Sequence, residues 1–301
     1  MKENYSNQNQ HFLITQEDKN YPTLLKEIKR APRQLYARGN LDLLNSTCIA
    51  IVGTRANTPY GESMALYFAR ALVSYGFTIV SGLAFGIDAV VHEKTIEYGG
   101  KTIAVLGNGI DSIHPRCHEN LGKKILENEG LILSEYAPGV AAYKSHFPMR
   151  NRIISGLSIG TLIIEAPKKS GALITARYAF EQNRDVFAIP GDLSRPTTEG
   201  NNHLIANEMA RLVRTPEDII SHLNHQPELL LKPLIKRSVN PKLTTQAQKE
   251  VWALLSSYPI YLDEIIKSSR LSVSEAVVAI SYLELKGLAK QTSHGQYIRG
   301  P

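Results

Sequence analysis

Short apolar runs alternate with longer amphipathic segments between about residue 47 and residue 223. The runs are rich in β-branched residues and apolar at nearly every position, which is typical of strands buried on both faces of a parallel sheet. The segments between them, such as 61–76 and 170–183, have helical periodicity. Strands that alternate with helices predict a mostly parallel, doubly wound α/β sheet of the Rossmann-like type. The predicted strands are 48–53, 77–82, 102–107, 131–135, 161–166, 185–191 and 210–214.

The pattern changes at both ends of this region. Residues 1–45 form an N-terminal leader, in which 21–40 predicts a short helix and a strand rather than a separate domain. Residues 225–242 contain three prolines and four Lys or Arg against one Glu, which predicts a linker. We therefore expect a Rossmann-like domain at 46–223, a linker at 224–243 and a second domain at 244–301.

The C-terminal domain has its own periodicity. Helical patterns cover 245–257, 262–269 and 272–288, and two short strands flank a turn at 294–295. Three helices followed by a small hairpin predict a winged helix. From residue 244 to 301 there are six Lys or Arg against five Asp or Glu, and the predicted recognition helix at 272–286 has one Lys against two Glu. Since a helix that enters a DNA groove usually carries more positive charge, we expect this domain to bind protein, or duplex DNA only weakly.

Composition narrows the class of protein only a little. The 301 residues carry a formal net charge of +6, which permits an anionic partner without requiring one. The two cysteines are too few for a disulfide framework, and Cys48 lies in an apolar run typical of a core. The chain opens on polar residues and contains no apolar stretch long enough to cross a bilayer, so we expect a cytoplasmic protein with no membrane partner.

Candidate ligand-binding residues lie where predicted strands lead into helices. In a parallel sheet these loops gather at the carboxyl edge of the strands, where ligands usually bind. Glycines allow the backbone to approach a ligand there, and free N–H groups at a helix start favour an anion. The candidates in three of these loops are Arg55, then Ser81, Gly82 and Gly86, and then Ser170 and Gly171.

The fourth candidate is the stretch YKSHFPMRNR at 143–152, which we expect to be an exposed loop. It places Lys144, Arg150 and Arg152 around the aromatic Phe147 and contains no acid. Cations neutralise phosphates and a ring stacks on an unpaired base, so this composition suits single-stranded nucleic acid. A solvated surface loop remains the alternative reading of the same residues.

Several catalytic signatures are missing from the chain. There is no P-loop, no G-x-G-x-x-G in the first strand-to-helix turn, no G-x-S-x-G and no metal-ligand spacing of His or Cys, so we expect neither catalysis nor a cofactor. Asp88, Glu135, Glu165 and Asp192 are interpreted as structural acids. The enzymatic alternative is a nucleoside-monophosphate phosphoribohydrolase, but its P-G-G-x-G-T-x-x-E motif is absent.

Several separated motifs together resemble one family. The chain carries, in order, GTR (53–55), YG (60–61), SGLAFGID (81–88), FPMRNRIISGLS (147–158), EAPKKSGALITARYA (165–179), PG (190–191) and GNNHLI (200–205). This order resembles the DNA-processing protein A family, DprA or Smf, over about residues 21–223. The tail is similar to the winged helix of many members.

The resemblance implies an extended Rossmann-like fold that binds single-stranded DNA without known catalysis. It also implies a homodimer that protects incoming DNA and loads the RecA recombinase during natural transformation. By position, Arg55 and Lys144 match the family's DNA-contacting cations and Phe147 its base-stacking aromatic. The same matching makes Ser81, Gly82 and Gly86 backbone contacts to phosphate. Arg150 and Arg152 match the R-N-R motif, either as DNA contacts or as braces of the pocket.

Overall fold

The computed structural model describes residues 11–224, 243, 245–256, 259–269, 271–292 and 295–299. The chain divides into two compact units, 1–236 and 237–301. Residues 225–242, where the sequence predicts a linker, lie outside the described part of the chain.

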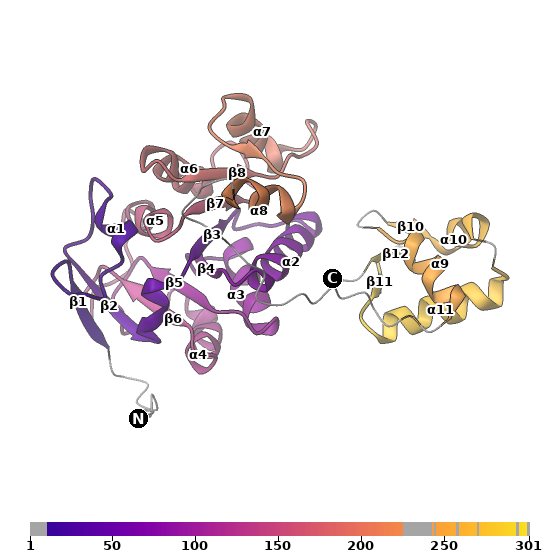
Figure 1. Cartoon of the computed structure of the whole chain (residues 1–301), viewed down its shortest axis with the longest axis horizontal. Helices are drawn as coiled ribbons and strands as arrows, with labels where there is room; N and C mark the ends of the chain where they lie inside the picture. The colour runs from indigo at the N-terminus through magenta and orange to yellow at the C-terminus, as the bar shows by residue number, and fades with distance from the viewer. Residues whose placement is uncertain are drawn as a thin grey trace. The chain divides into compact units, whose positions relative to one another are not determined.

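The first unit is built on one nine-stranded sheet in the order β1-β2-β6-β5-β4-β3-β7-β8-β9. Within the run β6-β5-β4-β3-β7-β8-β9 all adjacent strands are parallel, whereas β2 pairs antiparallel with both β1 and β6. The predicted doubly wound, mostly parallel fold is confirmed (Figure 1). The strands are β1 (Phe12–Thr15), β2 (Gln34–Gly39), β3 (Cys48–Val52), β4 (Thr78–Ser81), β5 (Thr102–Leu106), β6 (Leu131–Ser134), β7 (Gly160–Ile163), β8 (Asp185–Ala188) and β9 (Arg211–Leu212).

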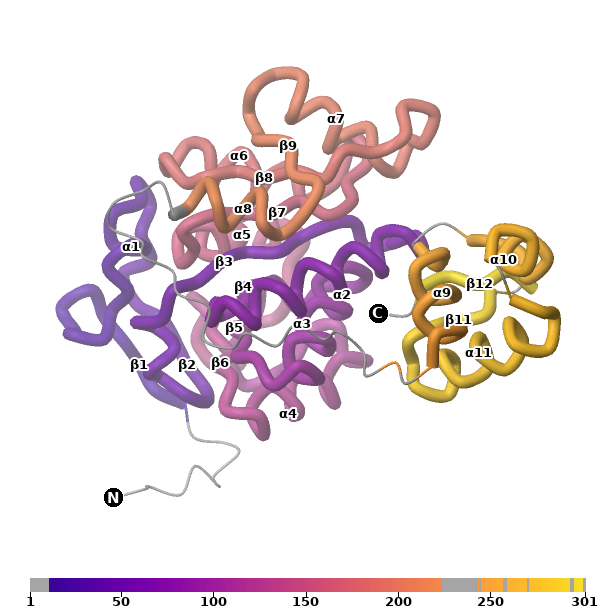
Figure 2. Tube along the Cα trace, turned by 45° about the vertical axis from the view of Figure 1, so that its right-hand side comes forward, coloured from indigo at the N-terminus to yellow at the C-terminus, as the bar shows by residue number. Residues whose placement is uncertain are grey.

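Helices cover both faces of this sheet (Figure 2). The α-helices are α1 (Thr23–Lys26), α2 (Pro59–Ser74), α3 (Ile87–Glu97), α4 (Glu119–Glu127), α5 (His146–Gly156), α6 (Gly171–Glu181), α7 (Glu199–Ala206) and α8 (Pro216–Asn224). Short 3-10 helices are η1 (Leu41–Asn45), η2 (Arg116–His118) and η3 (Pro196–Thr198).

Alternate residues of each central strand enter different cores, as the two-residue period of a strand requires. In β3, Ala50 packs with apolar residues of α1, α5 and α6, while Ile49 and Ile51 pack with residues of α2, α3 and α8. All five residues of β3 are buried. The near-continuous hydrophobicity of the predicted strands therefore reflects burial on both faces.

The strand order reverses at β3. From this strand the chain builds outward through β4, β5 and β6, then returns to place β7 on the other side of β3. The helix that follows β3 and the helix that follows β7 lie on opposite faces, since α2 and α6 contribute to different cores. Loops that diverge in this way leave a crevice at the carboxyl ends of the strands, which is where doubly wound proteins bind ligands.

The segment predicted as an N-terminal leader contributes to this sheet. Within it, β1 and β2 form the antiparallel edge, and Leu25 of α1 is fully buried in the core shared with α5. A helix and a strand were expected in 21–40, and both are present. The first strand, β1, was not predicted.

The second unit has the predicted winged-helix elements. Its helices are α9 (Gln246–Leu254), α10 (Leu262–Ser268) and α11 (Val273–Leu285), and its strands are β10 (Ile260–Tyr261), β11 (Ala289–Gln291) and β12 (Gln296–Arg299). Ser272 caps α11, because its hydroxyl accepts from the N–H of Glu275. Val251, Ile265 and Leu283 lie at the centre of a separate core. His294, in the predicted hairpin turn, lies outside the described residues.

Candidate nucleic-acid interface

A cavity of about 620 Å³ opens at the crevice between β3 and β7. Residues from five strand-to-helix connections line it, namely those after β3, β4, β5, β6 and β7. Six of the ten residues singled out in the sequence contribute to its wall: Arg55, Lys144, Phe147, Arg150, Ser170 and Gly171. The other four, Ser81, Gly82, Gly86 and Arg152, are not among the lining residues.

The loop after β3 presents Arg55 at the mouth of the cavity, where its side chain is exposed. A buried acid holds this loop in place. The carboxylate of Glu165 accepts from the N–H of Thr58 at 3.0 Å and from its hydroxyl, which in turn caps α2. The backbone N–H of Thr54 donates to the carbonyl of Glu165 at 2.7 Å. Glu165 is thus a structural acid, as the sequence suggested, and it ties the β3 loop to the β7 loop.

The aromatic ring of Phe147 packs closely against Gly107 and His114. Phe147 belongs to the first turn of α5, and a Cβ on Gly107 would come within 2.9 Å of its ring, so only glycine permits this approach. The ring of His114 lies 5.5 Å away, and the guanidinium carbon of Arg55 lies 5.6 Å from the centroid of the Phe147 ring. A cation and a partly exposed ring are therefore held side by side.

The expectation that 143–152 is an exposed loop is wrong from His146 onward. Residues 146–156 form α5, whose Ile153 and Ile154 are buried against the sheet. Helical periodicity turns Arg150 to the same side, and this arginine is only 3% exposed. The stretch 143–152 ends before Ile153 and Ile154, so its composition alone did not show the apolar face of the helix. Lys144 precedes the helix and is exposed, as expected.

The N-terminus of α6 forms the opposite part of the cavity wall. Ser170 is the N-cap, and its hydroxyl accepts from the N–H of Ala172 at 3.2 Å. Gly171 is exposed, and its carbonyl accepts from the side chain of Asn151 at 3.2 Å, which joins α6 to α5. The N–H groups and the positive end of the helix dipole favour an anion at this position.

The glycine turn between β4 and α3 binds a carboxylate of the protein itself, that of Asp88. The carboxylate of Asp88 accepts from the N–H of Gly82 at 3.1 Å, and the hydroxyl of Ser81 donates to the carbonyl of Ile51. At the carbonyl side of the same residue, Arg150 donates to the carbonyls of Gly82, at 2.8 Å, and Val105. The N–H of Gly82 that the resemblance assigns to phosphate is therefore already occupied by Asp88.

Burial dominates the titration of these two charges. It raises the pKa of Asp88, against the opposing influence of Arg150, and it lowers the pKa of Arg150 to about 10. Both groups line the cavity and are almost fully buried. Asp88 accepts from the N–H of Gly82 and Arg150 donates to its carbonyl, so the two side chains hold the backbone at Gly82 in place.

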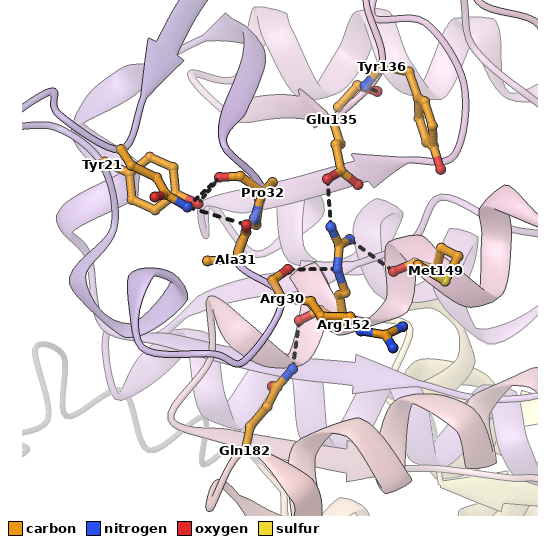
Figure 3. A network of polar contacts seen from close by, with 11 residues as sticks. Tyr21, Arg30, Ala31, Pro32, Glu135, Tyr136, Met149, Arg152 and Gln182 are labelled. Carbon is orange, nitrogen blue, oxygen red and sulfur yellow. Dashed lines mark hydrogen bonds and ion pairs between the residues drawn. The ribbon is translucent and has the colours of Figure 1, made fainter.

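Arg152 is not among the residues that line the cavity, and its side chain braces the molecule (Figure 3). Its guanidinium forms an ion pair with Glu135 at 2.6 Å and donates to the carbonyls of Arg30 and Met149. The backbone carbonyl of Arg152 accepts from Gln182 at 3.0 Å. One side chain thus joins the N-terminal segment, the end of β6 and α5, which fits the bracing role left open in the sequence analysis.

The residues that line the cavity but were not selected from the sequence include His114, Asn151 and Lys169. Lys169 directly precedes Ser170, in a loop that the sequence already assigns to the carboxyl edge. Its neighbour Lys168 instead forms an exposed ion pair with Glu199 at 3.2 Å. Nothing in the sequence pattern marks His114 or Asn151.

Among the described residues, no group of three His, Cys, Asp or Glu side chains is arranged to hold a metal ion. Within the same part of the chain, no helix is both long and apolar enough for a bilayer span. Asp88 is the sole carboxylate among the residues that line the cavity, and it is buried under Gly82. Cations, one aromatic ring and a helix N-terminus dominate the site.

These features define a doubly wound α/β protein with a cationic, aromatic-lined site at the carboxyl edge of its sheet and a separate winged helix. Residues 12–224 match the family described as DNA recombination-mediator protein A, and residues 236–295 match the DprA winged helix domain. The chain belongs to the DNA recombination-mediator protein A family. The resemblance inferred from the motifs is confirmed.

Known relatives agree with this assignment. Protein Smf of Escherichia coli is 45% identical over 213 residues, which are 71% of this chain and 57% of that protein. Protein Smf of Synechocystis is 38% identical and covers 99% of this chain and 82% of its own length. The chain thus spans little more than half of the Escherichia coli relative.

Two solved structures share the fold of the first unit. DNA processing protein A from Streptococcus pneumoniae superposes with a TM-score of 0.67 at 41% identity, covering 71% of this chain and 75% of that one. DNA processing protein A from Helicobacter pylori gives a TM-score of 0.63 at 32% identity, covering 72% and 96%. The Helicobacter pylori structure concerns the single-stranded DNA binding mode of that protein.

Proposed function

We propose that this chain binds single-stranded DNA in the cavity at the carboxyl edge of its sheet. The observation that carries the proposal is the pairing of Arg55 with the ring of Phe147, 5.6 Å apart, next to Lys144 and the N-terminus of α6. Arg55 and Lys144 neutralise phosphates, and the N-terminus of α6 accepts a further anionic group.

Phe147 gives the site its preference for a single strand. An unpaired base exposes its face to the ring, and stacking contributes about 1–3 kcal/mol per base with little sequence preference. The bases of a duplex are already stacked on each other, so the ring gains little from them. The single-stranded DNA binding mode described for the Helicobacter pylori relative supports this choice of ligand.

The wider role that we propose is recombination mediation without catalysis. A homodimer of the protein protects incoming DNA in the cytoplasm and transfers it to the RecA recombinase during natural transformation. The family description, a DNA recombination mediator, supports this role. The carboxylates of Glu165 and Asp88 accept hydrogen bonds from backbone N–H groups of the site. This structural role supports the proposal that neither acts as a catalytic acid or base.

Fluorescence anisotropy of labelled oligonucleotides, single-stranded and duplex, across a salt series tests the proposal. We expect the single strand to bind more tightly, with log K falling against log salt at about −0.7 per phosphate neutralised. Arg55→Glu and Lys144→Glu should weaken binding and flatten this slope. Phe147→Ala should weaken binding by about 1–3 kcal/mol.

Lys101→Glu is the matched control, because Lys101 directly precedes β5 at the amino edge of the sheet. It makes the same change of charge away from the cavity and should leave affinity unaltered. Wild-type affinity in all three cavity variants would overturn the site assignment. Release of free base from nucleoside monophosphates would instead favour the hydrolase alternative.

A further inference from the structure

One large aromatic side chain at the same edge of the sheet has no task in the proposed site. Phe85 is 50% exposed and lies in the turn between β4 and α3. Its neighbour Ala84 lines the cavity, as does Asp88 at the start of α3. Phe85 therefore stands beside the cavity without belonging to its wall.

The backbone that carries Phe85 is fixed on both sides. Leu83 adopts a left-handed conformation, with φ of 54°, and its side chain is fully buried. Gly86 has φ of 75°, and a Cβ there would come within 2.7 Å of the carbonyl carbon of Arg55, so the turn packs directly on the Arg55 backbone. Phe85 is thus presented by a turn in contact with the residue that defines the mouth of the cavity.

A second ring supports Phe85 from the next connection of the sheet. The ring of His118 lies 5.2 Å from that of Phe85 at an angle of 62°, and its Nδ1 lies 2.9 Å from the carbonyl of Leu83. His118 ends η2, which leads into α4, and α4 neighbours α3 in both views (Figures 1 and 2). The exposed Arg116 begins the same 3-10 helix and supplies a cation on this side.

The arrangement repeats the chemistry of Phe147: an exposed ring on a rigid support, braced by a histidine ring and near arginine. Preorganised rings stack on bases without the cost of ordering a flexible side chain. We propose that Phe85, braced by His118, is a second nucleobase-stacking subsite. A single strand in the cavity places one base on Phe147 and another base on Phe85, with Arg55 between the two turns. This inference rests on the proposed function.

The first test compares Phe85→Ala with Phe180→Ala in the full chain. Phe180 is 52% exposed but lies at the C-terminal end of α6, away from the cavity wall formed by the start of that helix. We expect Phe85→Ala to weaken binding of a single-stranded oligonucleotide roughly 5- to 150-fold, the equivalent of one lost stacking contact, and Phe180→Ala to leave it unchanged.

An abasic scan separates stacking from other causes. A single abasic nucleotide is moved along a short oligonucleotide of fixed register, and two positions should weaken binding to the wild type. Phe85→Ala should remove the sensitivity at one of these positions and Phe147→Ala at the other. If Phe85→Ala weakens binding but leaves both positions sensitive, stacking on Phe85 is wrong.

Fluorescence provides a direct readout of stacking. The chain has a single tryptophan, Trp252, which lies in the second unit. In a Phe85→Trp, Trp252→Phe double variant, the introduced indole should be quenched by single-stranded DNA and not by an equal concentration of duplex. Unchanged fluorescence at saturating single strand would contradict the subsite.

The outcomes distinguish the two proposals. Wild-type affinity in Phe85→Ala, together with weak binding in Lys144→Glu and Phe147→Ala, overturns the second subsite and leaves the proposed function standing. Wild-type affinity in all three variants overturns the proposed function itself.

Discussion

At the scale of single residues, the most perturbed histidine of the described chain is His92 of α3, which is fully buried. The hydroxyl of Thr102 donates to the carbonyl of Ile79, so it accepts from Nδ1–H of His92 at 2.7 Å. The other ring nitrogen, Nε2, is buried without a hydrogen-bond partner. Burial lowers the pKa of His92 to about 3, and the positive charges of Arg150 and His118 act in the same direction.

We expect His92 to make the free energy of unfolding depend on pH. Below pH 6.5 the unfolded chain binds a proton on this imidazole, whereas the folded protein does not until about pH 3. Stability should therefore fall as pH falls through this window, by at most about 1.4 kcal/mol per pH unit. Urea denaturation at pH 7 and pH 4.5 measures the loss.

His92→Asn is the control for the histidine contribution, since it keeps a polar group near Thr102 but does not titrate. The variant should lose less stability than the wild type between the two pH values, whatever its stability at pH 7. An equal loss in both proteins would assign the acid sensitivity to other groups.

At the scale of elements, α5 contributes one side chain to the cavity and another to the bracing of the fold. Phe147 contributes to the cavity, whereas Arg152 ties the helix to the N-terminal segment and to Glu135 at the end of β6. The side chain of Arg152 is 6% exposed, so its hydrogen bonds are made with little competition from water. The helix is therefore held at a fixed position relative to the strands that end at the cavity.

Arg152→Gln should destabilise the protein and spare DNA binding. Loss of buried hydrogen bonds to a charged group costs about 1.5–3 kcal/mol. Arg177→Gln is the matched variant, because the Arg177–Glu181 pair is exposed and contributes about 0–1 kcal/mol. Urea denaturation measures the change in stability, and fluorescence anisotropy on the same preparations measures DNA binding. Weakened DNA binding by folded Arg152→Gln would give this arginine a role in the interface.

The N-terminus of α6 allows its structural and its ligand roles to be separated. Ser170→Ala removes the cap and should cost about 1 kcal/mol of stability. Ser170→Asp keeps a capping oxygen and suits the helix dipole, so stability should be retained. Its negative charge should nevertheless weaken single-stranded DNA binding at low salt. Wild-type affinity in Ser170→Asp would place the phosphates elsewhere.

At the scale of the whole molecule, the two units carry different surfaces. The cavity belongs entirely to the first unit, whereas the outer side of α11 in the second unit is apolar and acidic. Val277, Val278 and Leu285 of this helix are exposed, and Leu285 is 86% exposed. A helix with this surface is poorly suited to a DNA groove, and the prediction that the domain binds protein stays to be tested.

We expect a fragment of residues 1–236 to bind single-stranded DNA with the affinity of the full chain. Each unit has its own hydrophobic core, so each should fold alone. Residues 237–301 alone should bind duplex DNA weakly or not at all. Anisotropy on both fragments, with circular dichroism to confirm folding, tests this division. A large loss of affinity in the first fragment would assign part of the interface to the winged helix.

The sequence by itself determined the fold class and the edge of the sheet at which the candidate site lies. Continuous β-branched runs indicate strands that are buried on both faces. Glycines, Arg55 and Ser170 follow such runs closely, so local patterns were enough to predict which residues lie at the carboxyl edge. The same holds for α11, whose Ser272 cap is a local signal. The motifs in their order identified the family.

Only the tertiary structure decided which of these residues face the cavity. Arg150, Arg152 and Lys144 are equivalent charges in the sequence. In the structure the first is buried in the cavity wall, the second braces the N-terminal segment and the third is exposed. Their separation depends on the helical phase of α5 and on partners distant in sequence. The contact between the N–H of Gly82 and Asp88 is decided in the same way, because the partner of an N–H depends on which side chain the fold brings to it.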